Sequence, residues 1–180
     1  MTTNPTIWTI GHSTRSFEVF LALLVENRIQ LVADVRSYPG SRRCPQFGQV
    51  PLREGLSERG LAYEWMQQLG GRRPARADSP NGAWRNAAFR GYADYMLTTE
   101  FGNALNELLQ LAQNKYTAMM CAEAVWWRCH RSMIADALKA RGVRVLHITN
   151  SDDVVEHPYT APARIVNGRL TYANEEQRAD

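Results

Sequence analysis

The 180-residue chain contains no hydrophobic run near the roughly 20 residues that a membrane-spanning helix needs. Its first residues, Met1–Thr6, also lack the basic and apolar regions of a signal peptide. Three cysteines, Cys44, Cys121 and Cys129, are too few for a disulfide framework and fit a reducing compartment. We therefore expect a cytoplasmic protein without a membrane partner.

The motifs of several well-known sites are also missing. The chain has no glycine-rich phosphate loop and no dinucleotide-binding fingerprint. Seven residues separate Cys121 from Cys129, which does not fit the Cys-x-x-Cys motif of thioredoxin-like proteins. Six residues separate Cys121 from Arg128, one more than a phosphatase-type loop contains. The residue types themselves must therefore indicate the chemistry.

Lysine is nearly absent, and arginine supplies most of the positive charge. The stretch from Arg36 to Arg90 contains ten arginines, no lysine and four acidic residues, a net charge of +6, whereas the rest of the chain carries −3. Guanidinium groups bind phosphate through paired hydrogen bonds, so the stretch could form an anion site. An ordinary solvated face explains the same composition, and the sequence leaves both readings open.

Apolar and turn patterns predict one α/β domain over residues 1–180, with a three-layer-like arrangement. Its mostly parallel sheet is flanked by helices, and Asn167-Gly168 predicts a small C-terminal hairpin over 165–170. We expect regularity to fade after Ser151. The expected strands are 7–10, 30–35, 61–65, 116–121 and 143–148, and the expected helices are 17–25, 51–59, 89–96, 100–111 and 130–141.

Two polar stretches separate these elements. Residues 36–50 form a loop of functional length, in which Ser41, Arg42 and Phe47 suit a phosphate and a stacked base. They equally suit an ordinary exposed loop with Phe47 as a core anchor. Residues 72–84 are polar, contain proline and glycine, and should be among the least ordered.

The segment Cys121–Arg131 holds the densest group of reactive side chains, between a predicted strand and a predicted helix. Other polar residues follow the ends of the first two predicted strands. Because carboxyl ends of parallel strands share one edge of a sheet, these side chains should line one pocket. The set is His12, Ser13, Asp34, Arg36, Cys121, Glu123, Cys129, His130 and Arg131.

Each member also has a structural interpretation. His12 suits a general base or metal ligand, or a loop histidine bonded to backbone, and Asp34 and Arg36 suit a simple ion pair. Cys129, near a helix start with His130 and Arg131, suits a reactive thiolate, although buried thiols are common. Cys121 suits a functional role and a structural role equally well. The position of Glu123 at the end of an apolar strand favours a functional role. A zinc site built from both cysteines and histidines is chemically permissible but weakly indicated.

Taken together, these residues resemble a bacterial and archaeal family known as domain of unknown function 488. The similarity covers residues 7–148 and leaves 149–180 as a C-terminal extension. It implies an α/β domain with one polar pocket, and it supplies no reaction. The matching segments are Thr9–Ser13, Asp34–Arg36, Pro39 with Ser41-Arg42, Leu69–Arg72, Tyr92–Met96, Cys121–Ala124, Cys129–Arg131 and His147-Ile148.

Three functions stay open from the sequence. The favoured one is a thiol-dependent enzyme acting on a phosphate-bearing small molecule, nucleotide or nucleic acid. In it, Arg36, Arg42 and Arg131 hold the anion, Cys121 or Cys129 reacts, and His12, His130 and Glu123 transfer protons. The second is a non-catalytic module that binds nucleic acid or another anion, and the third is a metal-binding protein. Cofactors, oligomeric state and the role of 149–180 cannot be inferred from the sequence.

Overall fold

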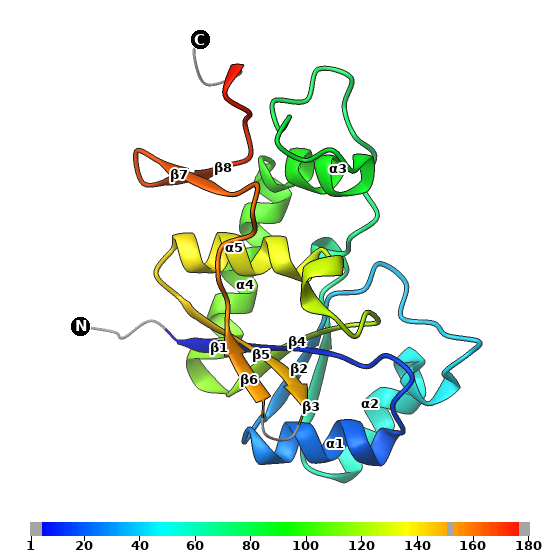
Figure 1. Cartoon of the computed structure of the whole chain (residues 1–180). Coiled ribbons are helices and arrows are strands. Elements are labelled where there is room, and N and C mark those ends of the chain that lie inside the picture. Colours follow the sequence, from blue (N-terminus) through cyan, green and yellow to red (C-terminus); the bar gives the residue numbers. More distant parts are fainter. Residues whose placement is uncertain (1–4, 151–152, 177–180) are drawn as a thin grey trace.

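The computed structural model describes residues 5–150 and 153–176 of the chain. The first six strands are β1 (Thr6–Gly11), β2 (Leu31–Asp34), β3 (Ala62–Trp65), β4 (Thr117–Cys121), β5 (Arg144–Asn150) and β6 (Asp153–Glu156). The α-helices are α1 (Phe17–Glu26), α2 (Gln49–Glu58), α3 (Ala87–Met96), α4 (Thr99–Asn114) and α5 (Arg131–Ala140). A last pair of strands, β7 (Arg164–Val166) and β8 (Arg169–Thr171), follows α5 and β6 (Figure 1).

The central sheet has the order β3-β2-β4-β1-β5-β6. Its first five strands in that order pair in parallel, and β6 pairs antiparallel with β5. The chain leaves β1 and returns as β2 on the far side of β4, so β4 lies between the two. Three strand ends that carry polar residues are therefore neighbours, although β4 lies far from the other two in the sequence.

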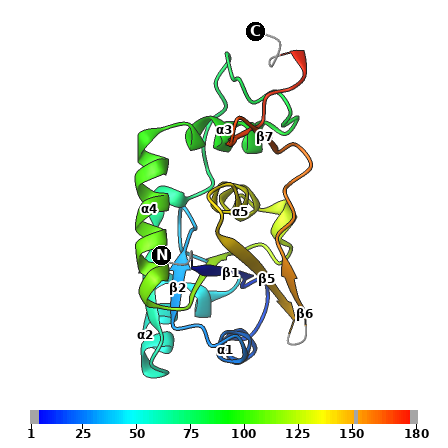
Figure 2. The ribbon, with the colours of Figure 1, turned by 90° about the vertical axis from the view of Figure 1, so that its left-hand side faces the viewer.

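Helices cover both faces of the sheet, which confirms the predicted three-layer α/β architecture. Residues of α1 and α2 pack with Val32, Ala118 and Met120 in one hydrophobic cluster. Residues of α3, α4 and α5 pack with Ala33 and Met119 in the other. Successive strand residues thus alternate between the clusters, as the pleat requires. Figure 2 shows α1 and α5 on opposite sides of the sheet, with α4 running along one side of the molecule.

The predicted C-terminal hairpin is also confirmed. Asn167 and Gly168 both have positive φ, +50° and +74°, and they join β7 to β8 in a separate two-stranded sheet. The expected loss of regularity after Ser151 is only partly right. Residues 151 and 152 lie outside the described residues, but β6 begins at Asp153 and adds an edge strand.

Candidate functional site

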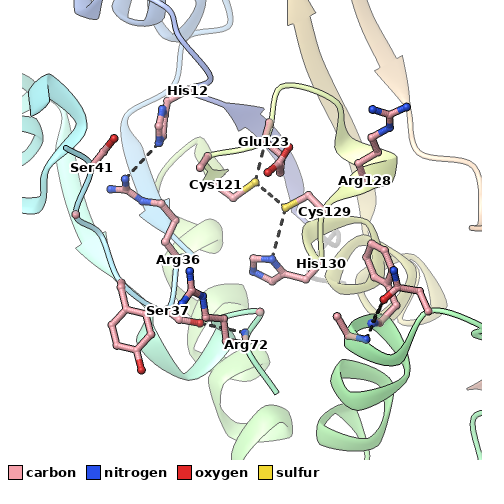
Figure 3. Close-up of a pocket in the computed structure, with 17 residues that line it drawn as sticks. His12, Arg36, Ser37, Ser41, Arg72, Cys121, Glu123, Arg128, Cys129 and His130 are labelled. Carbon is pink, nitrogen blue, oxygen red and sulfur yellow. Dashed lines mark hydrogen bonds between the residues drawn. The ribbon is translucent and has the colours of Figure 1, made fainter. Parts of the chain in front are cut away.

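A cavity of about 520 Å³ opens at the carboxyl edge of β2, β4 and β1. The strand ends are locked together by backbone bonds: the His12 amide donates to the Cys121 carbonyl at 2.9 Å, and the Val35 amide donates to the Met120 carbonyl at 3.0 Å. The cavity lies at the crevice where open parallel sheets place their ligands. Side chains from the strand ends, the 36–50 loop, the segment after η2 (Gln67–Leu69) and the β4–α5 loop surround it (Figure 3).

Seven of the predicted site residues line this cavity, although they come from three separate parts of the chain. They are His12, Arg36, Ser41, Cys121, Glu123, Cys129 and His130. The common position is the physical result of the strand order, because β4 carries Cys121 between the strands that precede His12 and Arg36.

Four other predicted site residues lie elsewhere. Asp34 is fully buried beneath Arg36, and Arg42 is exposed on its loop outside the cavity lining. Ser13 has φ +50° and contributes mainly backbone, since its carbonyl accepts a bond from His12 Nδ1 at 2.9 Å. Arg131 is 1% exposed and lies behind the β4–α5 loop, where its Nη2 donates to the carbonyls of Glu123 and Ala124.

Asp34 and Arg36 form the buried ion pair that the structural interpretation described. Arg36 Nη2 lies 2.6 Å from Asp34 Oδ2, and Arg36 Nε lies 2.8 Å from Oδ1. The Tyr63 hydroxyl also donates to Asp34 Oδ2, and burial together with the carboxylate raises the pKa of Tyr63. Despite the opposing effect of burial, the hydrogen bonds and charge of Asp34 raise the pKa of Arg36. The pair fixes the Arg36 guanidinium at the cavity wall.

His12 is held as a neutral imidazole with a defined tautomer. Its Nδ1 must carry the proton, because it donates to the Ser13 carbonyl, and Nε2 is then the acceptor. Arg36 Nη1 lies 3.3 Å from Nε2 and donates to it. Burial lowers the pKa of His12, and the Arg36 charge lowers it further. His12 therefore positions Arg36 in this state and has no free basic nitrogen for proton transfer.

The two cysteines of the site lie in direct contact. Cys121 Sγ and Cys129 Sγ are 2.6 Å apart, and both residues are almost completely buried beside the cavity. Burial opposes ionisation of Cys121, but the bond from Cys129 and the Arg131 charge outweigh it and lower the pKa of Cys121. Burial and the bond with Cys121 raise the pKa of Cys129. The electrostatics thus favour Cys121 as the thiolate.

This differs from the sequence-based preference for Cys129, because burial and the contact with Cys121 outweigh the effect of the nearby helix start. Helix α5 begins at Arg131 with His130 at its N-cap, so Cys129 lies one residue before the cap. The Cys129 amide bonds to Trp126, the first residue of the short helix η3 (Trp126–Arg128). The amide and the charge of Arg131 do act to lower the pKa of Cys129, but burial and the bond with Cys121 outweigh them and raise it.

His130 presents a basic nitrogen to this pair. Its Nε2 lies 2.8 Å from the Val35 carbonyl, which only accepts, so Nε2 carries the proton. Nδ1 is then an acceptor, 3.5 Å from Cys129 Sγ. Burial lowers the pKa of His130 to about 4, and the Arg131 charge contributes to that shift. A neutral base thus faces the Cys129 thiol.

Several lining residues were not among the predicted site residues. They include Ser37, Tyr38, Arg72, Asn86, Phe89 and Arg128. Arg72 was marked by the Leu69–Arg72 motif, and the Arg72 guanidinium lies 5.5 Å from the centre of the Tyr38 ring. Asn86 and Phe89, at the start of α3, had no sequence signal that would separate them from an ordinary helix start.

The described residues contain no group of three or more His, Cys, Asp or Glu side chains placed to hold one metal ion. The cysteine pair and His130 belong together, but His12 faces Arg36 instead of the sulfurs. The metal-site alternative therefore has no supporting geometry. Nor does any helix in the described part of the chain have the length and apolar character to cross a membrane.

The fold and cavity define the chain as an α/β protein with a polar, thiol-containing site at the carboxyl edge of its sheet. The family described as "Domain of unknown function DUF488" matches residues 16–138, and the chain belongs to that family. The match is shorter than the resemblance over 7–148 and leaves His12 and His147 outside it. No curated protein matches the chain. No solved structure matches it either.

Proposed function

We propose that the cavity binds a phosphate-bearing small molecule, with a nucleotide as the favoured class, and that the neighbouring thiols act on it. The observation that carries the proposal is the gathering of Arg36, Arg72 and Arg128 around one cavity of about 520 Å³. Cavities of roughly 300–1,000 Å³ are typical of small-molecule sites.

The balance of charge at the cavity wall supports an anionic ligand. Arg36 is compensated by Asp34, but within residues 5–150 and 153–176 neither Arg72 nor Arg128 has a carboxylate partner. Glu123 is the one acidic side chain in the lining. Guanidinium groups at the rim of a partly buried cavity bind phosphate through charge-assisted hydrogen bonds, which are stronger than neutral ones.

Aromatic rings at the same rim support a nucleotide over inorganic phosphate. Tyr38 is 69% exposed, and Phe89 is half-buried beside Asn86. An exposed ring next to guanidinium groups provides a stacking surface for a base while the phosphate meets the arginines. The Cys121–Cys129 pair and His130 then supply the nucleophile and the base in the interior of the cavity.

The test is a calorimetric titration of the full chain with pyrophosphate and with nucleoside mono-, di- and triphosphates. Arg72→Gln and Arg128→Gln should each weaken binding about tenfold or more, because a hydrogen bond to a charged group contributes about 1.5–3 kcal/mol. Arg53→Gln is the matched control, because Arg53 is exposed on α2 outside the cavity lining. Equal affinity in all three variants would refute the proposal.

The same titrations separate enzyme from binding module. Turnover of a bound nucleotide that is lost in Cys121→Ser, with affinity retained, would support a thiol-dependent enzyme. Binding without turnover, unchanged in Cys121→Ser and steeply weakened by salt, would instead support the non-catalytic module. The observation that supports this second candidate is the burial of both sulfurs, which limits the access of a large substrate to them.

A further inference from the structure

We propose that Cys121 and Cys129 form a two-electron dithiol centre that reduces small hydroperoxides and closes to a reversible intramolecular disulfide. The centre shares the cavity of the proposed function but does not require its phosphate-bearing ligand. Seven residues separate the two cysteines, so their contact comes from the fold and not from a short motif.

The first argument is geometric. Cys121 ends β4, and Cys129 lies at the far end of the β4–α5 loop, which folds back through the η3 helix. The two sulfurs lie 2.6 Å apart, and the labelled side chains in Figure 3 point toward each other. Cys44, the third cysteine, bonds instead to the Ser13 carbonyl. The fold therefore selects one pair of sulfurs that can be joined without moving an element.

The second argument is a buried charge without a counter-ion. Arg131 is 1% exposed, and its Nε and Nη1 have no hydrogen-bond partner among the described residues. Its third nitrogen meets only backbone carbonyls. Burying a guanidinium is costly unless an anion and hydrogen bonds compensate its charge. The Cys121 thiolate can serve as the counter-ion of Arg131, since the Arg131 charge acts to lower the pKa of Cys121.

The third argument is the base beside the second sulfur. Because His130 Nε2 donates to the Val35 carbonyl, Nδ1 is an acceptor, and it lies 3.5 Å from Cys129 Sγ. The pair is thus asymmetric: Arg131 favours ionisation of both sulfurs, but the bond between them lowers the pKa of Cys121 and raises that of Cys129, whose thiol faces the imidazole. This is the division between an attacking and a resolving cysteine.

The burial of the sulfurs selects the oxidant. Cys121 is 2% exposed and Cys129 4% exposed, and both are reached through the cavity. A protein disulfide cannot approach sulfurs at that depth, whereas hydrogen peroxide or a small organic hydroperoxide can.

The chemistry balances in two steps. The Cys121 thiolate attacks the terminal oxygen of the hydroperoxide, the O–O bond breaks, and the leaving alkoxide takes a proton from solvent to give an alcohol. Cys121 is then a sulfenic acid. Cys129 attacks that sulfur, and the Cys129 proton goes to the departing hydroxide, which leaves as water. Two thiols are oxidised, and one hydroperoxide is reduced to one alcohol and one water.

The test uses the reduced full chain, freed of reductant and treated with one equivalent of hydrogen peroxide. Two thiols per chain should disappear, peptide mass mapping should find Cys121 joined to Cys129, and dithiothreitol should restore both. The matched control Cys44→Ser should behave identically. At pH 6 the chain should react at least tenfold faster than a free thiol, since a thiol of pKa about 8.5 is less than about 1% ionised there.

Single variants distinguish the roles. In Cys129→Ser the reaction should stop at a sulfenic acid on residue 121, which dimedone traps, and in Cys121→Ser peroxide consumption should fall to the rate of a free thiol. A linkage through Cys44, an absence of the 121–129 linkage, or a rate no faster than a free thiol would each overturn the proposal. Each of these three contrary outcomes can be measured on the unsubstituted chain, so the test does not depend on whether a cysteine variant folds.

Failure here and failure of the proposed function are distinguishable. If the chain binds phosphate compounds through Arg72 but its thiols do not react with peroxide, the nucleotide site stands and only the redox centre is refuted. A functioning dithiol with no phosphate affinity would do the reverse.

Discussion

Gly11 occupies the tightest crossing of the site. A Cβ atom at this position would lie 1.8 Å from the Glu123 carbonyl oxygen and 3.0 Å from Arg131 Nη2. The end of β1 therefore passes directly under the β4–α5 loop, and only a hydrogen at Cα fits there. The same contact holds in place the loop that contains Glu123 and leads to Cys129.

Replacing Gly11 with alanine should displace the β4–α5 loop and destabilise the fold by about 1–3 kcal/mol, the usual cost of overpacking. Urea denaturation measures the loss. Gly102→Ala is the control, because a Cβ there meets nothing within 4 Å and the residue lies inside α4, where alanine should stabilise by about 0.5–1 kcal/mol. Equal changes in stability for Gly11→Ala and Gly102→Ala would contradict the tight contact between Gly11 and the β4–α5 loop.

Individual residues also show how far sequence reasoning can reach. His12, Arg36 and Cys121 were predictable because each follows an apolar strand, and parallel strands end at one edge. Their grouping needed the strand order, which places β4 between β1 and β2. The contact of Cys121 with Cys129 was not predictable, because the path of the intervening loop depends on its packing against Gly11 and Arg131.

At the scale of elements, the 72–84 segment is tied to α3 by one carboxylate. Asp94 accepts bonds from the Arg76 amide at 2.9 Å, from the Ser79 hydroxyl and from the Asn81 side chain at 2.8 Å. Asn81 is 3% exposed, so the segment has a buried anchor that its polar composition concealed. The expectation that it is among the least ordered parts stays a prediction.

Asp94→Ala should release this segment, because three donors lose their shared acceptor. We expect faster amide hydrogen exchange at Arg76 and Asn81 and earlier proteolytic cleavage within 72–84. Asp78→Ala is the control: its carboxylate also bonds to Arg76, but both side chains are exposed and such pairs contribute little. Similar exchange in the two variants would show that Asp94 does not hold the segment.

Local signals predicted elements well, and long-range pairing did not follow from them. Ser16 caps α1 by accepting from the Val19 amide, and Asn167-Gly168 forms the hairpin turn, as their residue types indicated. By contrast, β6 is exposed along its whole length and has no alternating burial. Its pairing with β5, an interaction across the sheet, is what makes it a strand.

Across the whole molecule, the C-terminal extension is fastened to the domain by a buried polar network. Asp136 on α5 accepts from His157 Nε2 at 2.9 Å, from Thr160 and from the Tyr172 hydroxyl at 2.8 Å. His157 Nδ1 lies 2.9 Å from His147 Nε2. This links residues 157–172 to α5 and β5, so the extension belongs to the core of the described structure.

Tyr172→Phe should therefore destabilise the whole fold and not just its terminus. Removing a hydroxyl that donates to a buried carboxylate should cost about 1.5–3 kcal/mol. Tyr159→Phe serves as the control, because Tyr159 is 36% exposed and contacts Lys139 through its ring face. Urea unfolding of both variants gives the comparison, and an undiminished stability of Tyr172→Phe would mean that the network does not fasten the extension.

The buried histidines make the stability of the whole protein depend on pH. Burial lowers the pKa of His130 to about 4 and that of His147 to about 2, against 6.5 for a free histidine. Between those values the unfolded chain binds more protons than the folded one, so the free energy of unfolding falls as pH falls below 6.5. The stabilisation is fully present above pH 6.5 and is lost progressively toward the folded-state values.

From pH 7.5 to 5.5, each of these two histidines should reduce the free energy of unfolding by about 1.4 kcal/mol, or about 3 kcal/mol together. Burial also lowers the pKa of His12, so His12 adds to the change in the same direction. In His130→Gln, whose amide can still donate to the Val35 carbonyl, the loss should shrink by about 1.4 kcal/mol, the contribution of His130 itself. Urea midpoints at the two pH values, with unchanged slopes, measure both quantities. A pH-independent midpoint would show that His130 and His147 charge freely in the folded protein, and an unshrunken loss in His130→Gln would assign the dependence to other groups.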